Sequence, residues 1–416
     1  MIRHNLAFYC IAILKLIVLV IIRCVAYLWP RQSNSVVMGC YGGDLYIDNP
    51  KYLLGYLLKN TKNTKLKITW IGKDCVREQL PQSDKLSFAT KGSLLAFWRL
   101  LNAKIWICCQ AINVDLTPLP IRGRAICIDL WHGIPIKYIG TQTPKARNTG
   151  TKATLLGHLY QKIALDLKSW LVVSNRQMIA LLCEGVSARY DKQRVLPFGT
   201  PRNDFLIIHA YDDKLKEKLR HKYSTLFGFR NTKKIILYLP TWRMRGDCVF
   251  AFYNQPFKIQ KEWKRMLDEN DAVLIEKHHW GTYLQYPDLE DSICSIAIPA
   301  DKQKLADVQE LLLIADVLIS DYSGAYIDFA LLKRPVIHFA YDYKEYSNDD
   351  SGLAYNLHDV AAGPIVYDLV ELKDKVYRAL KKPEFLPAEK FDQLVEYETG
   401  CSAQLIERFI NLSAKV

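Results

Sequence analysis

The sequence contains no Cys-x-x-Cys pair, although eleven cysteines are spread over its 416 residues. This absence excludes zinc fingers, whose ligands come in closely spaced pairs. An odd number of cysteines in a long chain favours a reducing compartment, where cysteine serves as a small buried apolar residue. Cys108 and Cys109 fit that role, because they are adjacent within an apolar, strand-like run. A catalytic cysteine is the alternative, but no cysteine lies beside a histidine.

The sequence also lacks a dense run of lysine and arginine and an aromatic RNA-binding signature, so nucleic acid is not predicted as a partner. Its formal net charge is nevertheless +13. Positive charge spread thinly over a surface attracts polyanions and anionic lipid. The composition therefore predicts a polyanionic substrate, a membrane surface, or both.

No Gly-x-Gly-x-x-Gly fingerprint is present, so a dinucleotide loop is not predicted. The first β–loop–α pattern instead has a strand over residues 35–40, the loop Tyr41-Gly42-Gly43-Asp44 and a helix over Lys51–Lys59. Glycines in such a loop let the backbone come close to a neighbouring segment or a ligand.

The N-terminal residues Leu6–Trp29 are almost wholly apolar and long enough for a bilayer span. Lys15 and Arg23 interrupt them, and a charge near the middle of a span costs on the order of 2.5–3.5 kcal/mol. Residues 1–30 are therefore expected to form a membrane-associated helix that either crosses the membrane or lies in its surface. A buried helix of the first domain is the third possibility. No small-residue cleavage site is present, so the helix is expected to be retained.

Short apolar runs alternate with helical patterns over the rest of the chain, which predicts parallel α/β sheets covered on both faces. A charge-rich segment from Tyr211 to Lys234 interrupts the pattern and predicts a surface helix and a linker. We therefore predict an N-terminal domain over residues 31–210, a linker over 211–233 and a C-terminal domain over 234–416. The predicted strands are 35–40, 66–71, 105–109, 125–130, 171–174, 194–198, 234–239, 272–276, 293–298, 317–319 and 336–339.

Two of these strands lead into side chains suited to proton transfer. Active sites of open α/β sheets lie at the carboxyl ends of the strands. His132 follows the strand 125–130, where an imidazole can take a proton from a hydroxyl near neutral pH. A histidine bonded to a turn carbonyl is the alternative. His278 and His279 follow another strand and point to opposite faces of an extended chain, so they do not predict a metal pair.

Other strand ends carry groups suited to phosphate. Arg202 and Arg243 each supply a forked cation after a strand. The loop 320–324, Ser-Asp-Tyr-Ser-Gly, precedes a predicted buried helix, whose first N–H groups and partial positive charge can bind an anion. An ordinary helix cap made by Asp321 or Ser323 is the alternative. Because successive strand ends carry such groups, the ligand site is favoured. No metal cluster is evident, and no cofactor is predicted.

Together these motifs resemble the CDP-glycerol glycerophosphotransferase family, the cytoplasmic membrane-associated enzymes that build teichoic acids and related phosphopolyol polymers. The resemblance covers nearly everything after the N-terminal helix. It rests on Tyr41-Gly42-Gly43, Asn49-Pro50-Lys51, Trp131-His132-Gly133-Ile134-Pro135 with Lys137 and Gly140, Gly199-Thr200-Pro201-Arg202-Asn203-Asp204, Pro240-Thr241-Trp242-Arg243, and the unit from Ser320 to Pro335.

The resemblance implies a GT-B architecture, in which two Rossmann-like domains face a cleft and the C-terminal one holds the nucleotide. It makes His132 the catalytic base and His278 the second catalytic histidine. The implied nucleotide and phosphate contacts are Arg202, Arg243, Asp321, Ser323 and Gly324, and the implied supporting residues are Gly133, Pro135, Lys137, Asn203, Asp204 and Asp328. The sequence departs from the usual family pattern at Ile134, Thr200, Gly324 and Lys277-His278-His279.

The resemblance further implies the reaction. A polyol phosphate, glycerol phosphate in the first instance, would pass from a CDP-polyol to a hydroxyl of a membrane-linked acceptor, with release of CMP. The product would be a teichoic acid or a capsule-like polymer, made at the cytoplasmic side of the cell membrane. Two alternatives stay open, a GT-B glycosyltransferase that uses a nucleotide sugar and a non-catalytic membrane-tethered scaffold. The sequence does not separate glycerol from ribitol donors.

Overall fold

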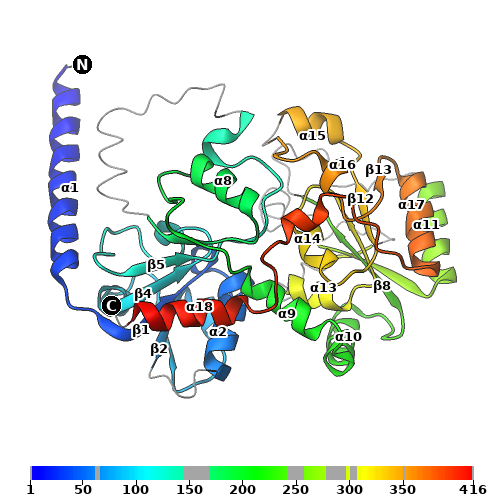
Figure 1. The fold of residues 1–416 in the computed structure, drawn as a ribbon, viewed down its shortest axis with the longest axis horizontal. Coiled ribbons are helices and arrows are strands. Elements are labelled where there is room, and N and C mark those ends of the chain that lie inside the picture. Colours follow the sequence, from blue (N-terminus) through cyan, green and yellow to red (C-terminus); the bar gives the residue numbers. More distant parts are fainter. Residues whose placement is uncertain are drawn as a thin grey trace. The chain divides into compact units, whose positions relative to one another are not determined.

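The structure is a computed structural model that describes residues 2–60, 66–144, 146, 168–241, 257–277, 297–299, 307–349 and 352–414. The chain divides into two compact units, shown in Figure 1. Unit 1 comprises residues 1–132, 149–202 and 397–416. Unit 2 comprises residues 133–148 and 203–396.

Unit 1 is built on a seven-stranded parallel sheet with the order β3-β2-β1-β4-β5-β6-β7. Its strands are β1 (Gln32–Met38), β2 (Lys67–Gly72), β3 (Leu86–Thr90), β4 (Ala103–Cys108), β5 (Ile126–Asp129), β6 (Trp170–Val172) and β7 (Val195–Leu196). The strand order reverses between β1 and β4. Ligands of such sheets bind beyond the carboxyl ends of the strands at this topological switch point.

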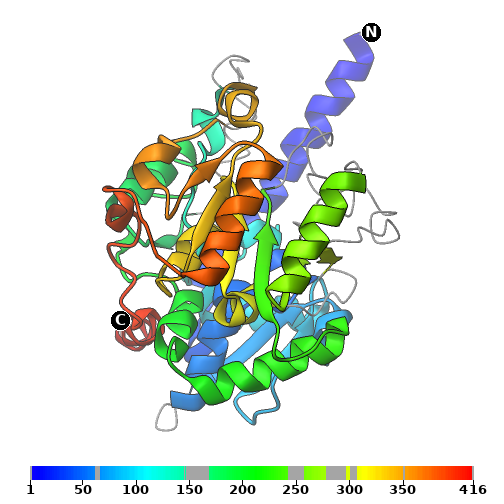
Figure 2. The ribbon, with the colours of Figure 1, turned by 90° about the vertical axis from the view of Figure 1, so that its right-hand side faces the viewer.

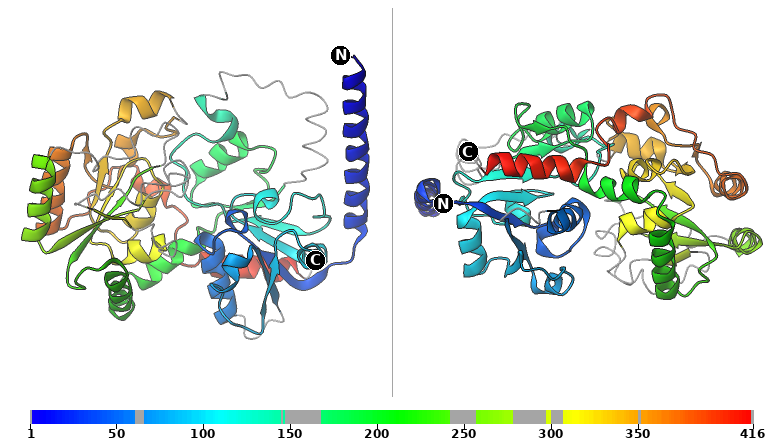
Figure 3. Two further views of the ribbon diagram at one scale, coloured as in Figure 1. Left: turned by 180° about the vertical axis from the view of Figure 1, so that it is seen from behind. Right: turned by 60° about the horizontal axis from the view of Figure 1, so that its bottom comes forward.

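Helices cover both faces of this sheet, which explains why its central strands are apolar on both sides. On one face, Leu53 and Leu57 of α2 (Asp48–Asn60) and Ile406 and Ile410 of α18 (Ser402–Ser413) pack against Val36. Figure 3 shows α18, drawn in red, lying along unit 1 although it is the last helix of the chain. The opposite face is covered by α4 (Leu94–Asn102) and the end of α1 (Ile2–Leu28).

Unit 2 repeats the same architecture with a six-stranded parallel sheet in the order β10-β9-β8-β11-β12-β13. Its strands are β8 (Lys234–Leu239), β9 (Ala272–Glu276), β10 (Ala297–Pro299), β11 (Val317–Ser320), β12 (Val336–Phe339) and β13 (Ile365–Val366). The helices α11 (Phe257–Glu269) and α17 (Leu369–Lys381) cover one face and stand in front of the strands in Figure 2. The other face packs against α10 (Asp213–Phe227), α13 (Val308–Ile314) and α14 (Ala325–Ala330). The switch point lies between β8 and β11.

The parallel sheets predicted from the sequence are confirmed, but the units differ from the predicted domain ranges. The surface helix predicted within the linker segment is confirmed as α10, but its Leu219 and Tyr223 are buried in the core of unit 2. Residues 397–416, predicted in the C-terminal domain, belong to unit 1 because α18 packs on α2. Two strands, β3 and β13, were not predicted.

The chain also passes from unit 1 into unit 2 directly after His132. Residues 133–148 belong to unit 2, where the side chains of Ile134 and Ile136 join its main apolar core. The backbone N–H of Ala354 donates to the Ile136 carbonyl at 2.8 Å, and the N–H of Tyr138 donates to that of Gly352 at 3.3 Å. The predicted supporting residues Gly133, Pro135 and Lys137 therefore lie in unit 2, not in the N-terminal domain.

The N-terminal segment is helical, as predicted, and forms α1. It is not the buried helix considered as one alternative, because Leu14 is 63% exposed and Ile21 is 56% exposed. Its last turns pack on the sheet, through the fully buried Ala26 and the partly buried Ile22. Within the described part of the chain, no helix combines the length and hydropathy needed to cross a membrane.

Candidate functional site

The turn that carries His132 follows β5 and has a fixed, unusual backbone. Trp131 adopts a φ of 55° and Gly133 a φ of 134°. A left-handed conformation costs a residue with a side chain of order 1–3 kcal/mol, and such outliers cluster at functional sites. The Trp131 N–H donates to the buried Asp129 carboxylate at 3.0 Å, and the Tyr190 hydroxyl donates to the second oxygen of Asp129 at 2.8 Å. Asp129 thus holds the turn in place.

The His132 ring is oriented for proton transfer. Its Nδ1 lies 2.9 Å from the carbonyl oxygen of Cys109. A carbonyl can only accept, so Nδ1 carries the proton and Nε2 of the neutral ring has the free lone pair. The ring lies against the Trp131 indole at a centroid distance of 4.4 Å, and the residue is exposed. The alternative, a histidine bonded to a backbone carbonyl, is therefore also correct. The bond from Nδ1 to the Cys109 carbonyl leaves Nε2 available as a base.

Arg202 lies beneath this turn and does not present a free cation. Its Nη1 donates to Asp48 Oδ1 at 3.0 Å and to the His132 carbonyl at 3.0 Å. The side chain of Arg202 is only 11% exposed, and that of Asp48 only 6%. Asp48 also accepts from the Tyr41 hydroxyl at 2.9 Å, and burial, followed by the Asp48 charge, raises the pKa of Tyr41. In the structure Arg202 therefore positions the His132 turn, and its contact with phosphate stays a prediction.

Asn49 is a second positioning residue, and it was not among the predicted site residues. It is fully buried, and its amide donates to the carbonyls of Leu130 at 3.2 Å and Trp131 at 3.0 Å. Its oxygen accepts from the backbone N–H of Arg202 at 3.1 Å. Asn49 thus joins α2, the His132 turn and the start of α9 (Pro201–His209). Its place in the Asn49-Pro50-Lys51 motif was the available signal.

Asp115 organises the switch point of unit 1 and was also not predicted. It is fully buried and accepts from the backbone N–H groups of Gly42 at 3.1 Å, Cys109 at 2.9 Å and Gln110 at 2.8 Å. Burial raises the pKa of Asp115, and these three N–H donors oppose the increase. The Lys91 ammonium donates to the Gly42 carbonyl at 2.8 Å. The loops after β1 and β4 are thereby tied together beside the carbonyl that His132 contacts.

The switch point of unit 2 is joined by Asp321. Its carboxylate is fully buried and accepts from the Thr241 N–H at 2.9 Å, the Thr241 hydroxyl at 2.6 Å and the Tyr322 N–H at 2.7 Å. These bonds connect the chain after β8 to the chain after β11. Asp321 therefore positions the two loops. Its place in the nucleotide and phosphate site stays a prediction.

His338 supports the same loop from β12. It is fully buried, and its Nδ1 lies 3.2 Å from the Asp321 carbonyl while its Nε2 accepts from the Ala362 N–H at 3.0 Å. Burial lowers the pKa of His338 to about 4, so the ring is neutral at physiological pH. Its location inside an apolar strand gave no sequence signal beyond a core histidine.

Ser323 and Gly324 lie beyond this buried layer. The Ser323 hydroxyl accepts from the Ala325 N–H at 3.3 Å, as expected of a local cap. Within the described part of the chain, the backbone N–H groups of Ser323 and Gly324 have no hydrogen-bond acceptor. Both residues are partly exposed. The loop therefore offers two backbone donors at the carboxyl end of β11.

Gly324 is required by a close approach to Ile134. A Cβ on Gly324 would lie 2.6 Å from the Ile134 carbonyl oxygen, which cannot rotate away because it belongs to the backbone. Gly324→Ala is therefore expected to lower the free energy of unfolding by about 1–3 kcal/mol. Chemical denaturation of the two proteins measures this change.

A matched control is Gly55→Ala in α2, where a Cβ meets nothing within 4 Å. A helical glycine replaced by alanine without steric conflict is expected to stabilise by about 0.4–1 kcal/mol. Equal stability of Gly324→Ala and the wild type would contradict the close approach.

Other predicted supporting residues have structural contacts within unit 2. The Gln309 amide donates to Asn203 Oδ1 at 3.4 Å and to Asp328 Oδ2 at 3.3 Å, which connects α9, α13 and α14 in the interior. Asp204 is 6% exposed. Lys137 forms an antiparallel bridge with Leu353. The predicted residues Arg243, His278 and His279 lie outside the described residues.

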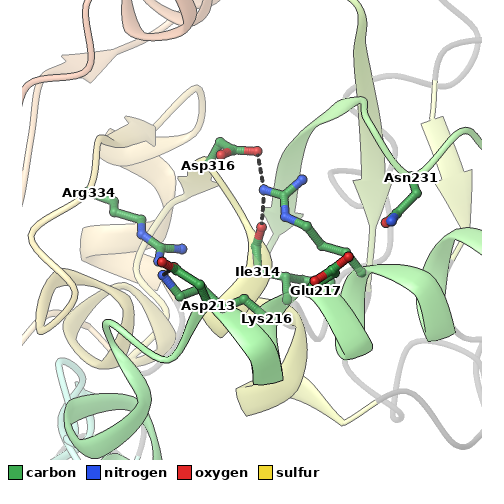
Figure 4. A pocket seen from close by; sticks show the side chains of 8 residues that line it. Asp213, Lys216, Glu217, Asn231, Ile314, Asp316 and Arg334 are labelled. Atoms are coloured by element: carbon green, nitrogen blue, oxygen red, sulfur yellow. Dashed lines mark hydrogen bonds and ion pairs between the residues drawn. The ribbon is translucent and has the colours of Figure 1, made fainter.

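A hollow of about 380 Å³ in unit 2 is shown in Figure 4. It lies at the amino ends of β8 and β11, the edge of the sheet opposite the Asp321 loop. The two arginines that line it form hydrogen bonds within the protein. Arg220 donates to the Ile314 carbonyl at 2.9 Å and to Asp316 at 2.8 Å. Arg334 donates to the carbonyls of Leu313 and Ala315, both at 2.8 Å. These contacts cap the end of α13, so the hollow is structural.

Two parallel sheets, each with its central order reversing once, define an α/β protein of the GT-B-like class with two Rossmann-like units. The chain belongs to the CDP-glycerol:poly(glycerophosphate) glycerophosphotransferase family, whose family model matches residues 21–412. The family consists of transferases, so the chain is assigned to this class of enzyme.

Individual relatives agree with this assignment. The chain is 25% identical over 391 residues to a teichoic acid poly(glycerol phosphate) polymerase of Bacillus spizizenii, covering 91% of this chain and 92% of the relative. It is 28% identical over 378 residues to a teichoic acid glycerol-phosphate transferase of Staphylococcus aureus, covering 90% of each. The solved structure of the wall teichoic acid polymerase TagF superposes with a TM-score of 0.71 at 27% identity, over 92% of this chain and 90% of that one.

Proposed function

We propose that this protein transfers a polyol phosphate, preferentially glycerol phosphate, from a CDP-polyol to a hydroxyl of a membrane-linked acceptor, with release of CMP. The product would be a teichoic acid or a capsule-like polymer. Besides the family assignment, one observation carries the proposal: His132 stands exposed beyond the carboxyl end of β5 with Nδ1 bonded to the Cys109 carbonyl. An imidazole held in this tautomer can accept a proton from a hydroxyl through Nε2.

The proposed reaction is a single in-line displacement. His132 Nε2 takes the proton of the acceptor hydroxyl as its oxygen attacks the β-phosphorus of the CDP-polyol. A new oxygen–phosphorus bond forms, and the bond from the β-phosphorus to the bridging oxygen of CMP breaks. The electron pair leaves with CMP, so no covalent enzyme intermediate is required. Transfer of this kind depends chiefly on positioning and on donors around the spreading negative charge.

Residues of unit 2 are proposed to stabilise the negative charge on the transferred phosphate. The backbone N–H groups of Ser323 and Gly324 would bind phosphate oxygens, because no described residue accepts from them. Arg243 and His278 are proposed to complete this phosphate site, on the strength of the motifs that carry them. Asp321, Thr241 and His338 would hold the loop in position.

The proposed location is the cytoplasmic side of the cell membrane, with α1 as the membrane-associated segment. The exposed apolar side chains of α1 and the formal net charge of +13 support this location, since both favour an anionic lipid surface.

Incubation of the purified protein with CDP-glycerol or CDP-ribitol, with and without a lipid-linked acceptor, tests the proposal by measuring CMP. We expect CMP release only with a CDP-polyol and acceptor together, and faster release from CDP-glycerol. The same assay with nucleotide sugars is the control for specificity. Release of nucleotide from a sugar donor, with none from either CDP-polyol, would favour the glycosyltransferase alternative.

A further inference from the structure

The helix α4 in unit 1 exposes apolar side chains on the face turned away from the sheet. Leu94 is 89% exposed, Leu95 is 47%, Phe97 is 38% and Trp98 is 53%. The opposite face of the same helix is buried through Ala96, Leu100 and Leu101. Surface helices normally carry polar residues on the outer face, and a contiguous apolar patch of this kind marks an interaction site.

The exposed face of α4 is continuous with the C-terminal end of α1. The indoles of Trp29 and Trp98 meet edge to face at a centroid distance of 5.9 Å, and Trp29 Nε1 donates to Asn102 Oδ1 at 3.3 Å. Exposed apolar side chains extend from this contact along α1 and include Val25 and Ile21, at 51% and 56% exposure. We call the set Ile21, Val25, Leu28, Leu94, Leu95, Phe97 and Trp98 the α1–α4 surface.

The end of α1 is fixed to the body of unit 1, so the α1–α4 surface has a defined shape. A Cβ on Gly123 would lie 2.1 Å from the Ala26 carbonyl oxygen, which shows how closely the two backbones approach. Arg124 Nε donates to the Tyr27 carbonyl at 3.0 Å, and its guanidinium lies 5.0 Å from the centre of the Tyr27 ring.

The two segments that form this surface carry exposed charge of one sign. The first 43 residues contain no aspartate or glutamate, and between Lys85 and Ile128 the only acidic residue is Asp115, which is fully buried. Basic residues in the same stretches include Lys15, Arg23, Arg99, Lys104, Arg122 and Arg124. An apolar surface whose own segments carry cations and no exposed acid is complementary to an anionic bilayer. Tryptophan, as in the Trp29–Trp98 pair, is enriched where hydrocarbon meets headgroups.

We propose that the α1–α4 surface inserts into the interfacial layer of an anionic bilayer, so that α4 is a membrane contact in addition to α1. This inference deepens the proposed function, because it specifies how unit 1 contacts the membrane that carries the acceptor. Interfacial helices bury their apolar face about 5–10 Å into the headgroup boundary. The two contacts together would fix the orientation of unit 1 on the lipid, which α1 alone would leave free to rotate.

Co-sedimentation of the full chain with vesicles tests this proposal without any substrate. Vesicles of phosphatidylcholine with and without phosphatidylglycerol are used at a lipid concentration that binds about half of the wild type. The variant Leu94→Ser with Trp98→Ser is expected to partition at least about tenfold more weakly onto the anionic vesicles, since two large apolar side chains are lost from the contact. The matched control is Val370→Ser with Leu386→Ser, which removes two exposed apolar side chains from unit 2, at 69% and 58% exposure.

A second variant guards against a folding effect. Leu94→Glu changes a side chain that is 89% exposed, so the fold has no reason to alter, and it places a negative charge on the contact. It should weaken partition onto anionic vesicles, whereas Val370→Glu should not. Wild-type partition by both Leu94 variants would overturn the proposal, as would a dimer in vesicle-free solution that Trp98→Ser dissociates. CMP release from a water-soluble acceptor is independent of vesicle binding, so failure of the proposed function is recognised separately.

Discussion

Replacing His132 with alanine is expected to slow CMP release by about 100- to 10,000-fold, the contribution of a well-placed general base. Affinity for the CDP-polyol should change little, because the proposed donor contacts lie in unit 2 and His132 acts on the acceptor hydroxyl. The turn itself should persist, since Asp129, Asn49 and Arg202 hold it through backbone groups. Steady-state CMP release and calorimetric titration with CDP-glycerol measure the two quantities.

The control for this variant is His221→Ala. His221 is an exposed histidine on α10, and its replacement should leave CMP release unchanged. A His132→Ala protein with wild-type activity would remove the assignment of the base. A variant that also loses donor affinity would show that His132 contributes to the donor site instead.

Replacing Arg202 with alanine is expected to lower the free energy of unfolding by about 3–5 kcal/mol, because Asp48 would remain as a buried carboxylate without its guanidinium. CMP release should fall as well, since the His132 carbonyl loses the donor that fixes the turn. Urea denaturation gives the stability, and the ratio of kcat to KM for the acceptor gives the effect on catalysis.

The double variant Arg202→Ala with Asp48→Asn separates the buried charge from the lost packing. Stability should recover in part, because the amide needs no counter-charge, whereas activity should stay low. Arg265→Ala is the matched control. Arg265 pairs with Glu269 at 2.6 Å but is 79% exposed, so its loss should leave the free energy of unfolding nearly unchanged. Equal effects of Arg202→Ala and Arg265→Ala would show that the Arg202 contacts are unimportant.

The central strands were predictable because strands buried on both faces are continuous apolar runs. The strands β8, β9 and β12 match their predicted residues. The edge strand β3 was missed because four of its five residues are only partly buried, which gives a mixed composition. The strand β13 has two residues, too few for any pattern. The helix α10 was predictable as a helix, but its burial against unit 2 was not, because its surface is highly charged and few of its residues are buried.

The sequence predicted that Arg202 and Asp321 follow strands, but it did not predict the partners of their side chains. The sequence shows that Arg202 and Asp321 are charged and follow predicted strands. It does not show that Arg202 pairs with Asp48, which is 154 residues earlier, or that Asp321 accepts from Thr241, which is 80 residues earlier. A charge that satisfies a partner in the fold and a charge that meets a ligand have the same local sequence. Only the tertiary contacts distinguish the two.

The return of the chain to unit 1 at its end has a consequence for biosynthesis. Until α18 has emerged from the ribosome, Leu53 and Leu57 of α2 have no cover from Ile406 and Ile410. The loop at Thr200 likewise lacks Glu398, which accepts from the Thr200 hydroxyl at 3.1 Å. Unit 2, by contrast, has all its segments once residue 396 is made. Unit 1 is therefore begun first and completed last, and the apolar side chains of α2 stay uncovered on the nascent chain until α18 is made.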